Sequence, residues 1–124
     1  TGGLGPNVIY DPVGGSYAEP CLRSIAWEGR YLVIGFAAGA DQIPKMPLNL
    51  TLLKGCQIVG VFWGAWAGMF PGENKKNFEE LFSLFSDGKI DPTPSDKFTL
   101  EDSANAIEHL KARKAKGKVI VSIN

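Results

Sequence analysis

The sequence has few of the residues that bind metal ions or act as nucleophiles: two cysteines and one histidine among 124 residues. Cys21, Cys56 and His109 cannot supply the four ligands of a structural zinc site or the histidine cluster of a catalytic one, so no metal site is predicted. Both cysteines lie among apolar residues, which favours buried, reduced thiols and a reducing compartment over a disulfide or a nucleophile. His109 follows a helical pattern with no serine or cysteine at triad spacing, so we expect a solvated helix residue and no catalytic triad.

Excess charge of either sign is also missing, since 13 Lys and Arg residues balance 13 Asp and Glu residues. A neutral chain has no field to hold a polyanion, so nucleic acid is not an expected partner. The most apolar stretch, residues 56–70, is shorter than the ~18 residues of a membrane span and is interrupted by three glycines. The chain begins with threonine and no signal-like segment follows, so we interpret this start as a cut or processed end.

Apolar runs and helical spacings alternate through the first half of the chain. Short apolar runs predict strands at residues 8–10, 31–36 and 57–62. Between them, Ser16 and Glu19 have capping-box spacing before a predicted helix over residues 17–27, and residues 48–53 predict a short helix. This order is typical of right-handed crossovers in a parallel sheet, which places the protein in the α/β class.

The second half begins with the strongest helical pattern, over residues 73–86, where four apolar side chains share one face and Gly88 follows. Residues 91–94 resemble a linker. Beyond it, residues 97–99 predict a brief strand, Thr99 and Asp102 could cap a helix, and residues 118–123 predict a last strand. The lysine and arginine residues before Gly117 would stabilise the C-terminal end of that helix through its dipole, although they could also contact a cofactor phosphate.

The glycines near the start do not form a dinucleotide fingerprint, because position 8 is valine and no strand precedes them. The informative positions are the ends of the predicted strands, where ligands of open parallel sheets bind. These ends are residues 11–14, 35–39 and 62–64, and their glycines would let a ligand approach the backbone. From their apolar character alone, Ile34 and Phe62 are predicted to lie in the core of the sheet and not in a binding site.

Several ordered strings closely resemble the zinc-independent quinone oxidoreductases of the medium-chain dehydrogenase/reductase superfamily: VIYDPVGG (8–15), LRSIAWEGR (22–30), LVIGFAAG (32–39), PLNL (47–50), LKG (53–55) and GKVIV (117–121). The resemblance covers nearly the whole chain but only the C-terminal part of such an enzyme. It implies the C-terminal half of a Rossmann-like, doubly wound parallel sheet over residues 1–90. Residues 91–124 would be a strand, helix and strand that return to the substrate domain, and the first three strands and the glycine fingerprint would lie upstream.

The same resemblance implies cofactor contacts. Asp11, Pro12 and Val13 would border the nicotinamide ribose, and the cofactor would run over the backbone of Gly14. Ile34, Gly35 and Phe36 would pass beneath the nicotinamide, and the backbone around Val61, Phe62 and Trp63 would meet its carboxamide. The cofactor would be NADP, a choice that rests on the family alone. No catalytic side chain is expected, because the cofactor transfers the hydride while the protein orients it. Trp63 and Trp66 could line an acceptor pocket or pack against the helix that carries Phe78.

The function implied is an NADPH-dependent, zinc-independent reductase of quinones or activated alkenes, located in the cytoplasm or alternatively in mitochondria. An enoyl reductase of the same superfamily is one alternative, and a non-catalytic fragment or assembly module is another. The isolated chain is expected to be inactive. The strand from Gln57 to Phe62 has no proline, lysine or inward charge to protect an edge, so we expect a homodimer through it and a monomer for Val59→Pro.

Overall fold

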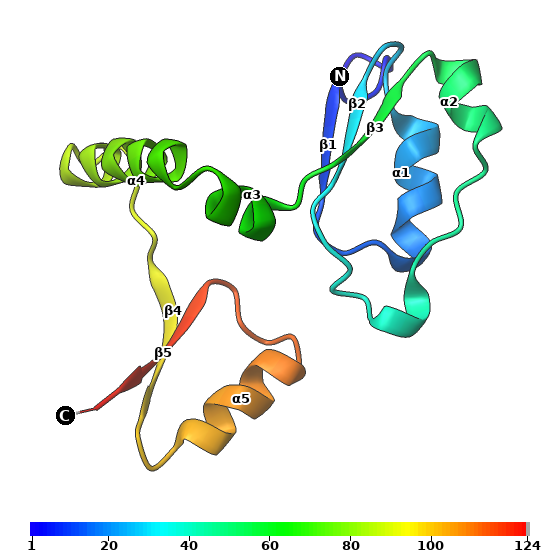
Figure 1. The fold of residues 1–124 in the computed structure, drawn as a ribbon. Coiled ribbons are helices and arrows are strands. Elements are labelled where there is room, and N and C mark those ends of the chain that lie inside the picture. The colour runs from blue at the N-terminus through cyan, green and yellow to red at the C-terminus, as the bar shows by residue number, and fades with distance from the viewer. Residues whose placement is uncertain (124) are drawn as a thin grey trace. The chain divides into compact units, whose positions relative to one another are not determined.

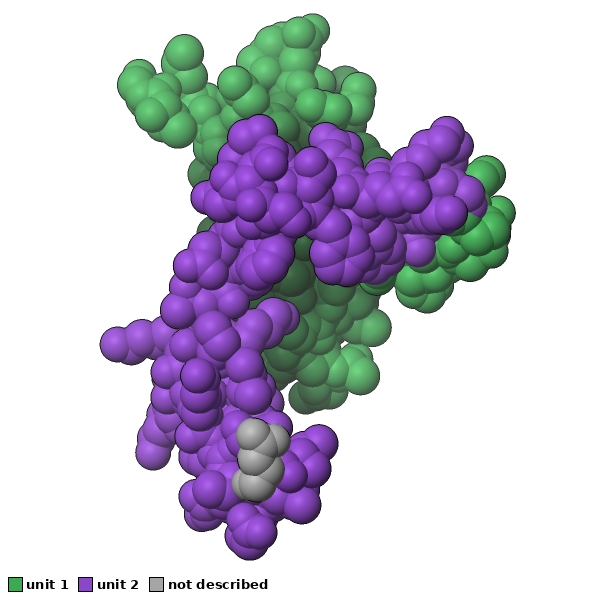
Figure 2. Space-filling model, turned by 90° about the vertical axis from the view of Figure 1, so that its left-hand side faces the viewer, with its two compact units in different colours: residues 1–71 green, residues 72–124 purple. Residues whose placement is uncertain are grey.

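The structure is a computed structural model that describes residues 1–123. The chain divides into two compact units, Thr1–Pro71 and a second that begins at Gly72, coloured separately in Figure 2. Each unit contains its own parallel sheet. No helix within residues 1–123 has both the length and the apolar character that a membrane span requires.

The first unit is a three-stranded parallel sheet in the order β1-β2-β3, as the sequence predicts (Figure 1). Its strands are β1 (Val8–Asp11), β2 (Arg30–Val33) and β3 (Gln57–Gly60). The connections contain α1 (Ala18–Ser24), α2 (Asn49–Lys54) and the short 3-10 turns η1 (Gly15–Tyr17) and η2 (Ala40–Gln42). Side chains of α1, of the residue that follows it, of α2 and of β2 form one buried cluster: Ala18, Leu22, Ile25, Tyr31 and Leu50. The two helices therefore cover the same face of the sheet.

Helix α1 differs from its prediction at both ends. Its N-cap is Tyr17, with no side-chain capping bond, and Glu19 instead pairs with Arg23 one turn later, at 2.6 Å. The predicted capping box is therefore wrong. The helix ends at Ser24 because Ile25 takes an extended conformation and enters the core. The amide of Ala26 then donates to the carbonyl of Pro6 instead of continuing the helix.

Strands β2 and β3 are shorter than the apolar runs that predict them, ending at Val33 and Gly60 rather than at residues 36 and 62. After Val33, the amides of Ile34 and Gly35 both donate to the carbonyl of Asp11, at 2.9 and 3.4 Å, and the regular ladder stops. After β3 the chain forms α3 (Trp63–Met69), a helix that the sequence analysis missed. Its two glycines, Gly64 and Gly68, weaken the helical pattern.

Helix α4 (Pro71–Ser86) begins at the last residue of the first unit and continues into the second. The second unit also contains β4 (Pro94–Thr99), α5 (Ser103–Lys111) and β5 (Lys118–Ser122). β4 and β5 pair in parallel and α5 makes the crossover, so the predicted strand, helix and strand are confirmed (Figure 1). The predicted cap is wrong, because α5 begins after Asp102 without a side-chain capping bond, while the hydroxyl of Ser103 donates to the carbonyl of Leu100 at 2.5 Å. Ala106 is the buried contact of α5.

His109 is not the solvated residue that the sequence predicts. Its side chain is only 22% exposed, and its Nε2 atom lies 3.2 Å from Oδ2 of Asp96 on β4. Its ring meets the ring of Phe98 edge-on, with centroids 5.7 Å apart. The hydroxyl of Ser95 also donates to Asp96, at 2.6 Å, and this bond and the nearby His109 hold the pKa of Asp96 below its ordinary value. His109 therefore attaches α5 to β4.

Candidate functional site

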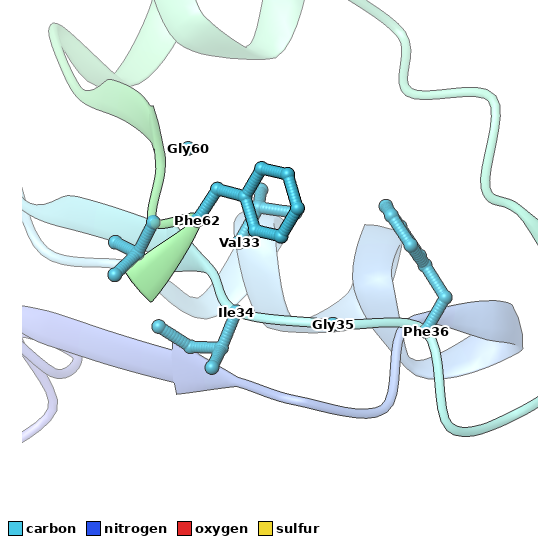
Figure 3. A pocket seen from close by; sticks show the side chains of 7 residues that line it. Val33, Ile34, Gly35, Phe36, Gly60 and Phe62 are labelled. Atoms are coloured by element: carbon cyan, nitrogen blue, oxygen red, sulfur yellow. The ribbon is translucent and has the colours of Figure 1, made fainter. Parts of the chain in front are cut away.

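The carboxyl ends of β2 and β3 open into a cavity of about 520 Å³ (Figure 3). Five of the ten predicted cofactor-binding residues line it, together with Val33 and Gly60: Ile34, Gly35, Phe36, Val61 and Phe62. The rings of Phe36 and Phe62 project into this space from two sides, whereas the side chain of Ile34 points away from them. The wall is therefore mostly apolar, with Ile34 contributing through its backbone.

The loop after β1 lies beside this cavity and is bonded to the loop after β2. The carbonyls of Pro12 and Val13 accept from the amides of Ala37 and Ala38, at 3.1 and 3.0 Å. Together with the two bonds to the carbonyl of Asp11, these contacts join the two strand ends into one rigid edge. Val61 is attached in the same way, because its amide donates to the carbonyl of Val33 at 2.9 Å. The three predicted strand-end loops are thus brought together.

The carboxylate of Asp11 points into the protein. Oδ1 accepts the amides of Val13 and Gly14, at 2.9 and 2.8 Å, and Oδ2 accepts the hydroxyl of Tyr31. Burial raises the pKa of Asp11, but the bonds from Gly14, Tyr31 and Val13 together outweigh it and keep the pKa below its ordinary value. Burial and the contact with Asp11 raise the pKa of Tyr31. Asp11 is therefore ionised and Tyr31 neutral at physiological pH.

Tyr31 is the functional candidate that the sequence analysis missed. It stands in an apolar strand, and a buried tyrosine there needs a partner for its hydroxyl, which was the available signal. Below the loops, Tyr31 and Asp11 help to line a second cavity of about 110 Å³. Val33 and Phe36 contribute to the walls of both cavities.

Four predicted residues of the β1 loop, Asp11, Pro12, Val13 and Gly14, support the edge without lining the larger cavity. Trp63 follows Phe62 directly as the first residue of α3. Within residues 1–123, no group of three or more His, Cys, Asp or Glu residues could hold a metal ion. Cys21 and Cys56 are free thiols, partly buried against the core of the first unit. The described residues therefore do not fit a zinc ion.

Comparison with known proteins identifies the family. The model of the zinc-binding dehydrogenase family matches residues 1–121. A quinone oxidoreductase-like protein 2 homolog of Nematostella vectensis is 37% identical over 98% of this chain and 33% of its own length. A mycobacterial protein solved in complex with NADPH superposes with a TM-score of 0.80 at 23% identity, over 98% of this chain and 37% of that one. A Pseudomonas syringae quinone oxidoreductase superposes with a TM-score of 0.77 at 24% identity, over 98% and 37% of the two chains.

This chain thus spans about a third of the length of the curated relatives that it matches. The superpositions confirm the predicted fold class, a mixed α/β fold with parallel sheets. The chain belongs to the zinc-binding dehydrogenase family.

Proposed function

We propose that this chain forms the nicotinamide side of an NADPH-binding cleft in an oxidoreductase that reduces quinones or activated alkenes. The observation that carries the proposal is the meeting of three loops, each following a parallel strand, beside one apolar cavity. Ligands of open parallel sheets bind at this edge, and the cavity lies within the usual range of ligand sites, about 300–1,000 Å³. Family membership and the NADPH bound to a structural relative support the choice of cofactor.

The residues fit the nicotinamide half of such a cofactor. The backbone of residues 34–36 forms a floor on which a flat ring can lie, and the rings of Phe36 and Phe62 flank it. Pro12 and Val13 would border the ribose, because their carbonyls are already bonded to Ala37 and Ala38 and the loop cannot fold into the cleft. The backbone near Val61, Phe62 and Trp63 would meet the carboxamide. Gly60 leaves open space where a side chain would stand.

A bound reduced nicotinamide supplies a hydride. This chain's residues would orient the ring and exclude water, because a fixed orientation and a dry site favour direct transfer to the acceptor. No side chain of the cavity wall is acidic or basic. The chemistry that we assign to this chain is therefore binding and orientation, and it needs no zinc.

We also propose that this chain is part of a longer parent enzyme. Residues 1–90 would belong to its nucleotide-binding domain and residues 91–124 to its substrate domain. The site that anchors the pyrophosphate would lie in residues before this chain. Enoyl thioesters are the alternative acceptors, because an apolar cavity fits either an enone or a quinone.

The test uses the complete 124-residue chain and reduced nicotinamide mononucleotide, which carries only the half of the cofactor that this cavity would hold. Saturation-transfer NMR should detect binding, and an excess of adenosine 2′,5′-bisphosphate should not displace the probe. The chain should show no NADPH-dependent quinone reduction above a control without protein. Absence of probe binding would refute the nicotinamide assignment. Turnover by the chain alone would refute the requirement for a longer enzyme.

A further inference from the structure

Asp11 and Tyr31 form a buried pair between β1 and the neighbouring β2. Tyr31 is 2% exposed and Asp11 is 8% exposed, and the tyrosine hydroxyl donates to Oδ2 of the carboxylate. Among the described residues, the ion pairs do not include Asp11. Its charge is balanced instead by three hydrogen-bond donors: Tyr31 on one oxygen and the amides of Val13 and Gly14 on the other.

The other carboxylate oxygen of Asp11, Oδ1, determines the shape of the loop after β1. Two consecutive amides directed at Oδ1 of Asp11 hold residues 12–14 in a tight turn, in which Gly14 has φ 66° and ψ −136°. A Cβ atom built on Gly14 would lie 2.9 Å from Cδ1 of Phe36, so the ring of Phe36 rests directly on the glycine. Phe36 in turn forms part of the cavity wall. Contacts thus run without a gap from Tyr31 through Asp11 and Gly14 to Phe36.

We propose that Asp11 and Tyr31 are positioning residues: their pair fixes the turn at residues 12–14 under the ring of Phe36 and so sets the wall of the ligand cavity. Neither side chain touches the ligand. The carboxylate already serves three donors and faces inward, so it is not a ligand of the ribose. The identity of the ligand rests on the proposed function, whereas the positioning of Phe36 does not.

A purely structural pair would stabilise the fold without affecting the cavity. Tyr31→Phe separates the two roles, because it removes one donor from Asp11 and leaves every residue of the larger cavity wall unchanged. The matched control is Ile25→Val, which trims a fully buried side chain of the same core that lines neither cavity. A second control, Tyr17→Phe, removes the hydroxyl of a tyrosine that is 63% exposed.

The first measurement needs no ligand. In the unmodified chain, the amide protons of Val13 and Gly14 should shift together as Asp11 titrates, and a nuclear Overhauser effect should join the α-protons of Gly14 to the ring of Phe36. Tyr31→Phe should raise the midpoint of that titration and weaken the Gly14–Phe36 contact, because the carboxylate loses a donor. Ile25→Val and Tyr17→Phe should change neither. An unchanged Gly14–Phe36 contact in Tyr31→Phe would overturn the inference.

The second measurement is affinity for reduced nicotinamide mononucleotide. Losing one net hydrogen bond should weaken binding about fivefold in Tyr31→Phe. Ile25→Val should bind normally even if its midpoint of thermal unfolding falls as far as that of Tyr31→Phe. Equal affinity of Tyr31→Phe and Ile25→Val would make the pair structural only and would overturn its role in binding. If the unmodified chain does not bind the probe, the proposed function fails, and the positioning of Phe36 is decided by the first measurement.

Discussion

Gly14 lies in direct contact with the ring of Phe36, 22 positions further along the chain, with no room for a side chain between them. The glycine belongs to the turn after β1, and the phenylalanine to the loop after β2. The contact therefore joins two strand ends beside the cavity of the proposed nicotinamide site. It explains why a glycine is needed at this point on two independent grounds, space and backbone conformation.

Gly14→Ala should destabilise the first unit. The combination of φ 66° and ψ −136° is nearly restricted to glycine, and the new Cβ atom would meet Phe36. We expect a loss of about 1–3 kcal/mol in the free energy of unfolding, measured by urea denaturation. Gly68→Ala is the control: it lies within α3 with nothing within 4 Å of its Cβ position, and alanine should stabilise that helix by up to about 1 kcal/mol. Equal stabilities of the two variants would contradict the assigned geometry.

Gly60→Val should impair binding while leaving the fold intact. Nothing lies within 4 Å of its Cβ position, and valine suits a strand, yet this residue lines the larger cavity. We expect stability within about 0.5 kcal/mol of the unmodified chain. Affinity for reduced nicotinamide mononucleotide should fall about tenfold, which corresponds to a loss of about 1.4 kcal/mol in binding free energy. Gln57→Val, on the same strand but outside the cavity wall, should bind normally; a similar loss there would point to a general effect of the strand.

Acid should weaken the first unit through Asp11. Its pKa in the folded chain lies below the ordinary value of 3.8, so the unfolded chain takes up the proton more readily. This contribution to stability is fully present at neutral pH, begins to decline as the pH approaches 3.8, and is lost as the pH falls through the folded pKa. Asp11→Asn should cost on the order of 1–2 kcal/mol at pH 7 and progressively less in acid. Urea denaturation at pH 7, 5, 4 and 3 tests this, and a constant difference between the two proteins would contradict it.

The expected homodimer requires a different proline test from the one that the sequence suggests. The amides of Gln57 and Val61 donate to Gly29 and Val33, beside β2, so the amide of Val59 faces β2 by the alternation of the strand. The amide of Ile58 faces the opposite way, toward the free edge. We therefore expect Ile58→Pro to give a monomer with normal circular dichroism, and Val59→Pro to disrupt the sheet itself.

Light scattering at tens of micromolar measures this directly. The unmodified chain should have the mass of a dimer. A monomer mass for the unmodified chain, or a dimer mass for a folded Ile58→Pro variant, would exclude β3 as the interface.

The sequence by itself determined the order of strands and helices and the parallel sheet, because apolar runs, helical spacing and glycines are local signals. It also placed the candidate site at the ends of the strands. The end of β2 was not a local property, since hydrogen bonds from Ile34 and Gly35 to Asp11 end its regular ladder. Capping patterns at Ser16 and Thr99 failed because neither residue became an N-cap.

Only the tertiary structure decided what Asp11, Tyr31 and His109 do. Asp11 and Tyr31 are 20 positions apart, and the parallel pairing of β1 with β2 makes them neighbours. The sequence predicted a solvated His109 because its sequence neighbours are those of an exposed helix. In the structure, Asp96 and Phe98 of β4 contact its side chain. In each case the partner comes from a different element, and hydrogen bonding between elements depends on the fold, which no local pattern encodes.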